Sequence, residues 1–353
     1  METIEEIIIQ KISHSSLHLV DWDHLEFGKY NSDHMLVCDY AEGEWKVPEI
    51  VPFSNLSLSP TALALHYGQT IFEGMKAFRM QDGSINIFRP RKHYERMLLS
   101  AERMCMPAIP RQIFLEGLQR LVELDSNWVP SSQGSALYIR PFMIATEARL
   151  GVKVAEEYKF IIVNSPVETL YPKPIKVKIE RDFVRACRGG TGYAKCGGNY
   201  GAAFYPTQKA RQEGFDQVIW MDSRENNYVE ESGMMNVMFV IGDKIMTPPL
   251  SDSILDGVTR DSLLVLARDA GIPVEEKPIH VDQLKDAFRK NSISEAFGVG
   301  TAAVASAIQM IGIDDLKYYL PSGPFKVMEF LKNKFNRVRT GLDPDIHRWN
   351  HVV

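Results

Sequence analysis

Cysteine is scarce in this sequence, which has four cysteines among its 353 residues. They stand at positions 38, 105, 187 and 196 without any Cys-x-x-Cys spacing, which argues against a disulfide-rich scaffold. The first residues, Met1 to Glu6, are acidic, whereas export and transit peptides are basic. We therefore expect a protein of a reducing compartment, the cytoplasm, and we expect no metal site.

Positive charge is also limited, because 40 Lys and Arg residues face 45 Asp and Glu residues and no long basic run occurs. The net charge of −5 argues against a nucleic-acid-binding protein, because such proteins normally carry a basic surface. Residues 296–313 carry no charge, but glycines and polar residues interrupt this stretch. We expect a buried strand, a glycine turn and a short apolar helix there, and no membrane segment.

The remaining composition, 45% hydrophobic and 24% charged, is typical of a soluble globular protein, and the length suggests about two domains. Three prolines in 166–174 predict a linker. The expected units are a small α+β domain (1–165), this linker, and a large domain (175–353), which gives a mixed α/β protein overall. Strands are expected at 35–40, 85–88, 136–144, 159–164, 217–221 and 295–299, a hairpin at 236–241 with 244–247, and helices at 91–105, 111–124, 202–213 and 259–270.

The most informative segment is 188–201, where six glycines in fourteen residues surround Lys195. So many glycines predict a shaped loop rather than a helix or strand, and they allow close approach of a ligand. Lysine can anchor a phosphate, donate a salt bridge or form a Schiff base. A P-loop is excluded because Ala194 and Cys196 flank the lysine, and a dinucleotide fingerprint lacks its leading Gly-x-Gly.

Three further segments carry groups that could bind the same ligand as Lys195. Gly257-Val258-Thr259 opens an apolar helix, and Gly300-Thr301-Ala302 forms a second glycine-hydroxyl turn, so that either could bind a phosphate. Glu230 and Glu231 precede an apolar strand, where a carboxylate could keep a pyridine nitrogen protonated. Together with Lys195 these features describe a pyridoxal phosphate site.

The chain also resembles the branched-chain amino acid aminotransferases, fold-type IV pyridoxal phosphate enzymes. The resemblance runs from about Phe27 to the C-terminal helix. It rests on the ordered segments 33–35, 66–77, 138–141, 195–200 and 297–302. It implies two domains with the cofactor at their interface, and a homodimer in which the loop around Leu150-Gly151-Val152 reaches the neighbouring subunit's site.

The resemblance also assigns roles to individual residues. Lys195 is expected to form the Schiff base with pyridoxal 5'-phosphate and to carry the proton during transamination. Tyr200 would contact the phenolic oxygen and Glu231 the ring nitrogen. The phosphate would be bound by Arg96, Val258, Thr259 and Thr301. The substrate site would comprise Phe27, Tyr67, Phe72, Tyr138, Arg140, Val152, Thr301 and Ala302, with Gln217 tuning the polarity nearby.

The implied reaction moves an amino group between leucine, isoleucine or valine and 2-oxoglutarate. Met234 stands where relatives carry a smaller residue, and Ala303 and Ser306 replace a redox Cys-x-x-Cys found in mitochondrial relatives. Three alternatives remain open: a D-amino acid aminotransferase, an aminodeoxychorismate lyase of the same fold, and a catalytically silent cofactor-binding protein.

Overall fold

A computed structural model describes residues 6–132, 134–168 and 173–353, and these form two compact units. The first unit contains the described part of Met1–Thr169 together with Ala194–Gly198 and Val338–Val353. The second unit contains the described part of Leu170–Tyr193 and Asn199–Arg337. The segment around Lys195 and the C-terminal segment therefore group with the first unit, although the sequence placed both in the second domain. Of the expected linker, residues 169–172 lie outside the described residues.

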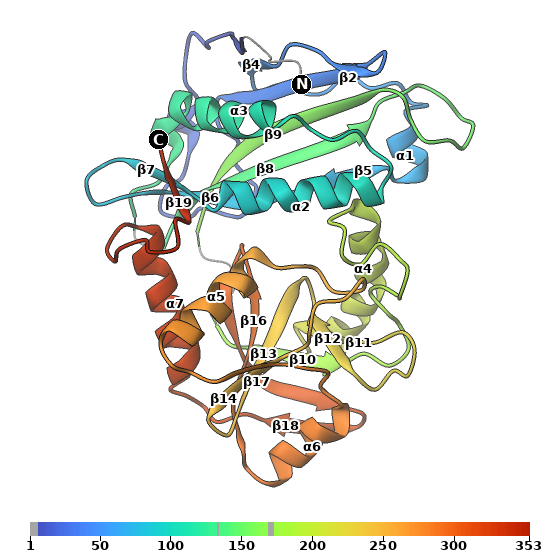
Figure 1. Cartoon of the computed structure of the whole chain (residues 1–353), viewed down its shortest axis with the longest axis vertical. Coiled ribbons are helices and arrows are strands. Elements are labelled where there is room, and N and C mark those ends of the chain that lie inside the picture. Colours follow the sequence, from blue (N-terminus) through green and yellow to red (C-terminus); the bar gives the residue numbers. More distant parts are fainter. Residues whose placement is uncertain (1–5, 133, 169–172) are drawn as a thin grey trace. The chain divides into compact units, whose positions relative to one another are not determined.

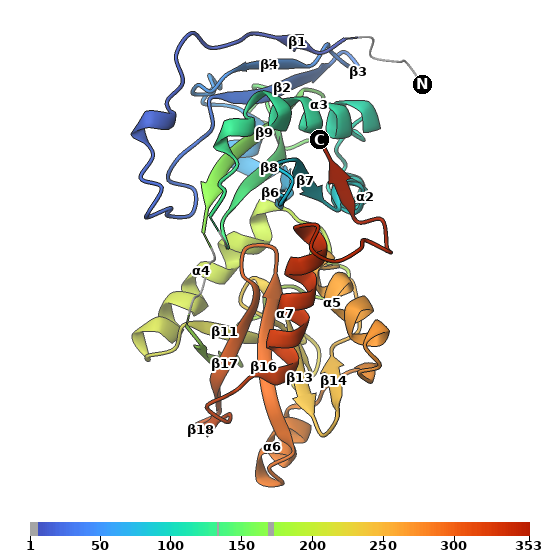
Figure 2. The ribbon, with the colours of Figure 1, turned by 90° about the vertical axis from the view of Figure 1, so that its left-hand side faces the viewer.

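A ten-stranded sheet forms the first unit, in the order β1-β4-β2-β9-β8-β6-β7-β19, with β3 beside β2 and β5 beside β8. Its strands pair antiparallel except for β1 with β4. The last strand of the chain, β19, lies beside β7 (Figure 2). The strands are β1 (Ile8–Ile9), β2 (His34–Ala41), β3 (Glu44–Trp45), β4 (Glu49–Pro52), β5 (Thr70–Phe72), β6 (Met75–Arg79), β7 (Ile85–Phe88), β8 (Ala136–Ala145), β9 (Tyr158–Val167) and β19 (Asn350–Val352).

Helices α2 and α3 pack against this sheet (Figure 1). Helix α3 buries Ile113, Leu118 and Leu121 on one face, as their helical spacing predicts. Gly117 lets α3 approach β2 closely, because a Cβ atom there would lie 2.3 Å from Leu36. The helices of this unit are α1 (Leu63–Tyr67), α2 (Pro90–Arg103) and α3 (Arg111–Leu124), with short 3-10 turns at Leu17–Leu19 and Ser126–Trp128.

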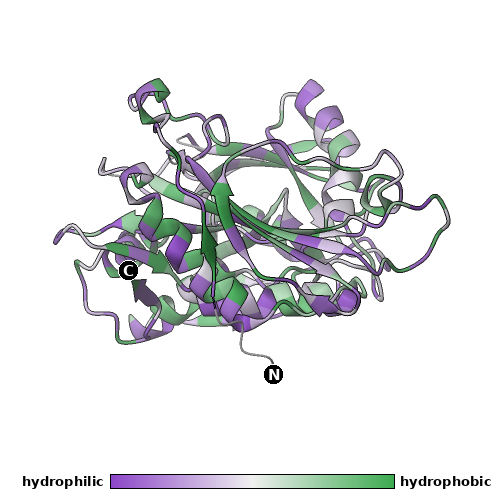
Figure 3. Ribbon diagram, turned by 90° about the horizontal axis from the view of Figure 1, so that it is seen from above, coloured by the Kyte–Doolittle hydropathy of each residue, from purple (hydrophilic) through white to green (hydrophobic). Residues whose placement is uncertain are grey.

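A nine-stranded mixed sheet forms the second unit, in the order β12-β11-β10-β17-β16-β13-β14-β15, with β18 beside β17. The apolar residues of its strands form the second core, and Figure 3 shows long strands of the chain that are largely green, the colour of hydrophobic residues. The strands are β10 (Ile175–Ile179), β11 (Gln217–Met221), β12 (Val229–Ser232), β13 (Met235–Ile241), β14 (Lys244–Thr247), β15 (Val274–Glu276), β16 (Ile293–Gly300), β17 (Val304–Ile313) and β18 (Leu316–Tyr319). The remaining helices of the chain are α4 (Gly197–Gln212), α5 (Val258–Asp269), α6 (Val281–Arg289) and α7 (Lys326–Arg339).

Two local predictions are wrong. The expected apolar helix before Ile313 is strand β17, which is paired on both sides by β10 and β16. A strand buried on both faces is a continuous apolar run, and periodicity cannot distinguish such a run from a buried helix. The glycine segment also becomes helical at its end, since α4 begins at Gly197. Within the described residues, no helix is both long and apolar enough to cross a membrane.

Candidate functional site

Lys195 is fixed through its backbone in the first unit. Its N–H donates to Ser100 Oγ at 2.9 Å, and its carbonyl accepts from the N–H of Phe72 at the same distance. Cys196 forms a β-bridge with Ile71, so the segment lies along β5. Gly197 is required at the next position because a Cβ atom there would lie 2.5 Å from Thr70 Oγ1. This close approach explains the glycine at the first position of α4 despite its low helix propensity.

Four of the expected substrate-site residues gather in the first unit. The rings of Phe27 and Tyr138 meet edge to face with centroids 4.8 Å apart. Arg140 donates to the Tyr138 hydroxyl at 3.0 Å, and its guanidinium carbon lies 4.8 Å from the centre of the Phe72 ring. Lys195 Nζ also lies 4.8 Å from that ring. The amine expected to react is therefore placed beside the residues expected to bind substrate.

Tyr67 and Val152 belong to another part of the same unit. The Tyr67 hydroxyl donates to the Leu150 carbonyl, so it anchors the loop that includes Gly151 and Val152. Val152 is 80% exposed and Leu150 is 64% exposed. The substrate roles of Tyr67 and Val152 stay predictions.

Arg96 lies in a buried ion-pair network that the sequence reading did not foresee. Its Nε and Nη2 atoms contact the two carboxylate oxygens of Glu73 at 2.6 and 2.8 Å, and His93 Nδ1 lies 2.6 Å from the same carboxylate. Burial opposes ionisation of Glu73, but the charges of Arg96 and His93 outweigh it and hold the pKa of Glu73 well below its ordinary value. Glu73 therefore sets the orientation of Arg96, the residue expected to bind the phosphate.

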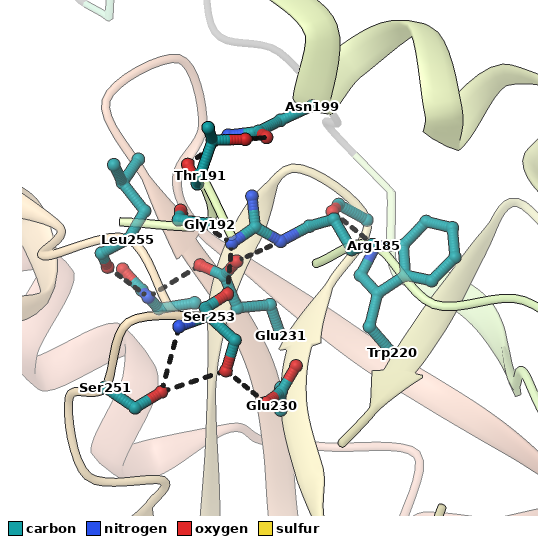
Figure 4. Close-up of polar contacts among 12 residues, drawn as sticks. Arg185, Thr191, Gly192, Asn199, Trp220, Glu230, Glu231, Ser251, Ser253 and Leu255 are labelled. Carbon is teal, nitrogen blue, oxygen red and sulfur yellow. Dashed lines mark hydrogen bonds and ion pairs between the residues drawn. The ribbon is translucent and has the colours of Figure 1, made fainter. Parts of the chain in front are cut away.

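In the second unit, β12 positions Glu231 opposite Asn236 of β13. Asn236 Nδ2 donates to Glu231 Oε1 and to the Leu255 carbonyl, both at 3.0 Å. Arg185 Nε lies 2.6 Å from Glu231 Oε2 (Figure 4). The Arg185 Nη2 group donates to the carbonyls of Gly192 and Ser253 at 2.9 and 2.5 Å. Glu231 is thus a buried carboxylate with a fixed cationic partner, and Arg185 is a site residue that the sequence reading missed.

Glu231 and Tyr200 line the same small cavity. Its walls are Arg185, Asn199, Tyr200, Ala203, Glu231, Gly233, Met234 and Leu255. Asn199 links the start of α4 to the glycine loop, because it accepts from Thr191 Oγ1 at 2.7 Å and donates to the Thr191 carbonyl at 2.8 Å (Figure 4). Met234, the expected departure from the family pattern, is in this lining.

The two expected phosphate loops are connected to Glu231 through Asn236. Helix α5 starts at Val258 and Thr259 directly after Gly257. A Cβ atom at Gly257 would lie 1.9 Å from Asn236 Oδ1, so the helix start packs against that amide. Asn236 also pairs with Val299 of β16, which leads to the turn containing Thr301 and Ala302. Asn236 therefore contacts both Glu231 and the start of α5, and it pairs with the strand that leads to this turn.

We predict that Gly257→Ala lowers the melting temperature of the protein. Gly257 has a φ of −71°, which alanine can adopt, so the clash with Asn236 decides the outcome. Relieving that clash displaces Asn236 from Glu231, at a cost of about 1–3 kcal/mol in unfolding free energy. Gly201→Ala is the matched control, because nothing lies within 4 Å of its Cβ position in α4. An unchanged melting temperature for Gly257→Ala would contradict the prediction.

Comparison with known proteins identifies the family. A model described as amino-transferase class IV matches residues 70–311, which include Glu73, Arg96, Lys195, Tyr200 and Glu231. The chain belongs to the class IV aminotransferase family. Branched-chain-amino-acid transaminase 1 of Bacillus subtilis (strain 168) is 47% identical over 294 residues, covering 82% of this chain and 83% of that protein. The expected family is thereby confirmed.

Solved structures of branched-chain aminotransferases share the fold. The branched-chain aminotransferase from Thermoproteus uzoniensis with norvaline is 24% identical and has a TM-score of 0.74, with 90% of this chain and 99% of that chain covered. The T.th. branched-chain amino acid aminotransferase with pyridoxamine 5'-phosphate is 26% identical, with a TM-score of 0.72 and coverages of 89% and 97%. The expected fold class is confirmed by these likenesses.

Glu73, His93 and Arg185 are the site residues that sequence reasoning missed in this class IV aminotransferase. Glu73 lies inside the segment that carried the resemblance, and a carboxylate directly after the apolar β5 is a usable signal. His93 lies inside the helix expected over 91–105, where its sequence neighbours do not indicate an ionic partner. Arg185 gives no local signal, because its partner Glu231 is 46 residues away in the sequence.

Proposed function

We propose that this protein is a pyridoxal-phosphate-dependent aminotransferase that moves the amino group between a branched-chain L-amino acid and 2-oxoglutarate. The observation that supports it best is the position of Lys195 Nζ. This atom and the guanidinium carbon of Arg140 each lie 4.8 Å from the centre of the Phe72 ring. An amine and a guanidinium that each lie near the same aromatic ring are suited to an apolar substrate that carries a carboxylate. The curated relative from Bacillus subtilis supports the same substrate class.

The residues present fit pyridoxal phosphate. A protonated pyridine nitrogen needs an anionic partner. Glu231 is a buried carboxylate whose orientation is fixed by Asn236 and Arg185. Tyr200 lines the same cavity and offers a hydroxyl for the phenolic oxygen. Val258 and Thr259 open α5 after a glycine that supplies no capping side chain, which suits a phosphate. Arg96, oriented by Glu73, and Thr301 complete the proposed phosphate ligands.

When bound, the cofactor supplies an electron sink for the bonds to the substrate α-carbon. Lys195 would supply the amine that holds the cofactor and would carry the proton between the substrate Cα and the cofactor C4′. Glu231 keeps the ring nitrogen protonated, and Tyr200 donates to or accepts from the ring oxygen. Phe27, Phe72 and Tyr138 exclude water from the substrate side chain. Ala302 and Thr301 are proposed to bind the substrate carboxylate, and Gln217 is proposed to adjust the polarity of the site.

The proposal extends to a homodimer in the cytoplasm. The exposed apolar side chains of Leu150 and Val152 stand on a loop that Tyr67 anchors, so a second copy of the chain could cover them. Burial of such side chains is favourable by about 25 cal/mol per Å². Val152 is proposed to enter the substrate site of the partner subunit.

We predict 2-oxoglutarate-dependent formation of 2-oxo acids from L-leucine, L-isoleucine and L-valine. An apolar pocket separates substrates that differ by one methylene by only about 1–3 kcal/mol, so all three donors should react within about 200-fold of one another in kcat/KM. A coupled assay for glutamate measures this. D-alanine and aminodeoxychorismate are the control substrates, and turnover of either one without turnover of L-leucine would replace the proposed reaction by one of the alternatives.

A further inference from the structure

Glu230 is a buried carboxyl group that the proposed chemistry does not use. It precedes Glu231 in β12, and both side chains are nearly inaccessible, with 8% and 4% exposed. Because successive side chains of a strand point to opposite faces, Glu230 points away from the cavity that Glu231 lines. Figure 4 shows Glu230 directed to the loop of Ser251 and Ser253. The site therefore has a second carboxyl group behind the first.

The Glu230 carboxyl group has few hydrogen-bond donors that could stabilise its ionised form within the described residues. Ser253 Oγ donates to Glu230 Oε1, and the Ser251 and Ser253 hydroxyls are 3.0 Å apart. Within the described residues, no hydrogen-bond donor reaches the buried Glu230 Oε2 atom. A buried carboxylate normally accepts several hydrogen bonds, so this environment favours the protonated form.

The charges around Glu230 come from three segments of the second unit: Glu231 on the same strand, Arg185 on the segment before the glycine loop, and Asp222 after β11. Burial raises the pKa of Glu230 to about 7; the Ser253 hydrogen bond and Arg185 lower it, and Glu231 and Asp222 raise it. Asp222 already accepts hydrogen bonds from backbone N–H groups, including those of Glu225 and Tyr228.

Ser253 connects the two carboxyl groups. Its hydroxyl contacts Glu230, and its carbonyl accepts from Arg185, which pairs with Glu231 (Figure 4). The charges of Arg185 and Glu231 cancel. A protonated ring nitrogen placed against Glu231 adds one positive charge to this buried network, and an ionised Glu230 would cancel it.

We propose that Glu230 is the charge-balancing residue of the cofactor site: it holds a proton in the cofactor-free protein near pH 6 and loses that proton when a protonated pyridine ring binds at Glu231. The O–H bond of Glu230 breaks, its electron pair stays on the carboxylate, and the proton passes to solvent. The inference rests on the proposed function, because the ligand is pyridoxal phosphate. Glu230 acts through Ser253 and Arg185 and is therefore a positioning residue.

The test is the number of protons exchanged when the cofactor-free protein binds pyridoxal 5'-phosphate. Calorimetry in buffers of different ionisation enthalpy gives this number for the wild type and for Glu230→Gln. Near pH 6, where Glu230 is protonated before binding, the wild type should release up to about one proton more than the variant. Near pH 9, where Glu230 is already ionised, the difference should vanish. Proton changes at Lys195 and the phosphate are common to both proteins and cancel.

Ser253→Ala is a second variant that keeps the carboxyl group. Loss of the only described donor to Glu230 disfavours the anion further, so the extra proton release should persist to a higher pH than in the wild type. A structural role of Ser253 alone would not move this pH. An unmoved midpoint would overturn the inference even if Glu230→Gln failed to fold.

The cofactor-free protein gives an independent readout in its thermal stability. The folded-state pKa of Glu230 is about 7, above the ordinary 4.5, so the folded state retains a proton that the unfolded state has lost. Glu230 therefore costs stability increasingly as the pH rises through this window, and Glu230→Gln removes that cost. The melting temperature of the variant relative to the wild type should rise from about pH 5 to about pH 7 and then level off.

The outcomes separate the two proposals. Equal proton release by wild type and Glu230→Gln at both pH values, with normal cofactor binding, would overturn the role of Glu230 and leave the proposed function intact. Failure of both proteins to bind pyridoxal 5'-phosphate would overturn the proposed function and this inference with it. A difference in proton release near pH 6 that vanishes near pH 9 would support both.

Discussion

Lys195→Ala is expected to abolish transamination while the protein stays folded. The side chain is the proposed attachment point and proton carrier, and loss of the proton-transfer role alone costs about 10²–10⁴-fold in rate. The fold should persist because the hydrogen bonds that fix this segment, to Ser100 and from Phe72, are made by the backbone of residue 195. Initial rates with L-leucine and 2-oxoglutarate, together with a circular dichroism spectrum, measure both parts of the prediction.

Chemical labelling makes the Lys195 prediction specific. Borohydride reduction of the wild-type protein with pyridoxal 5'-phosphate should fix the label on the peptide that contains Lys195, and the alanine variant should lose that label. Lys209→Ala is the control, because Lys209 lies on α4 with its side chain 43% exposed and its Nζ atom 3.6 Å from Asp182 Oδ2. Label on another lysine, or undiminished turnover in Lys195→Ala, would contradict the assignment of Lys195 as the attachment point of the cofactor.

Helices and strands that bury only one face could be predicted from the sequence, because their apolar residues recur at a regular spacing. The apolar spacing in 111–124 defines α3 to the residue, and the Gly242-Asp243 turn sets the β13–β14 hairpin in the expected register. Prediction failed where local signals conflict with tertiary packing. The apolar sequence of β17 predicts a helix, although the segment is a strand. Glycine stands at the start of α4 because a Cβ atom at position 197 would clash with Thr70.

The candidate site could be predicted only as far as motifs and the family resemblance reach. Lys195, Tyr200 and Glu231 stand in such motifs, and the structure places Tyr200 and Glu231 on one cavity. The partners that control these groups could not be predicted, because they act across long sequence separations. Arg185 meets Glu231 only after β11 and β12 pair, and Glu230 meets Ser253 only when the loop before α5 folds back.

Glu73→Gln is expected to lower the unfolding free energy by about 3–5 kcal/mol, because it removes a buried carboxylate charge that contacts Arg96 and His93. Glu73 is fully buried, and Arg96 and His93 both contact its carboxylate. Its pKa lies below the ordinary 4.5, so its stabilising contribution is present above about pH 4.5 and is lost as the pH falls through the lower folded-state value. The difference between wild type and variant should therefore shrink in acid.

Urea unfolding at pH values from about 7 down to about 3, below the ordinary pKa of 4.5, measures this difference. Glu95→Gln is the matched control on the exposed side of α2, where removal of a surface carboxylate changes stability by about 0.5 kcal/mol or less. The Glu73 variant should also bind pyridoxal 5'-phosphate more weakly, since Arg96 loses the two contacts that orient its guanidinium. If Glu73→Gln unfolds like Glu95→Gln, the buried carboxylate does not hold Arg96, and the proposed phosphate ligand must be oriented by other groups.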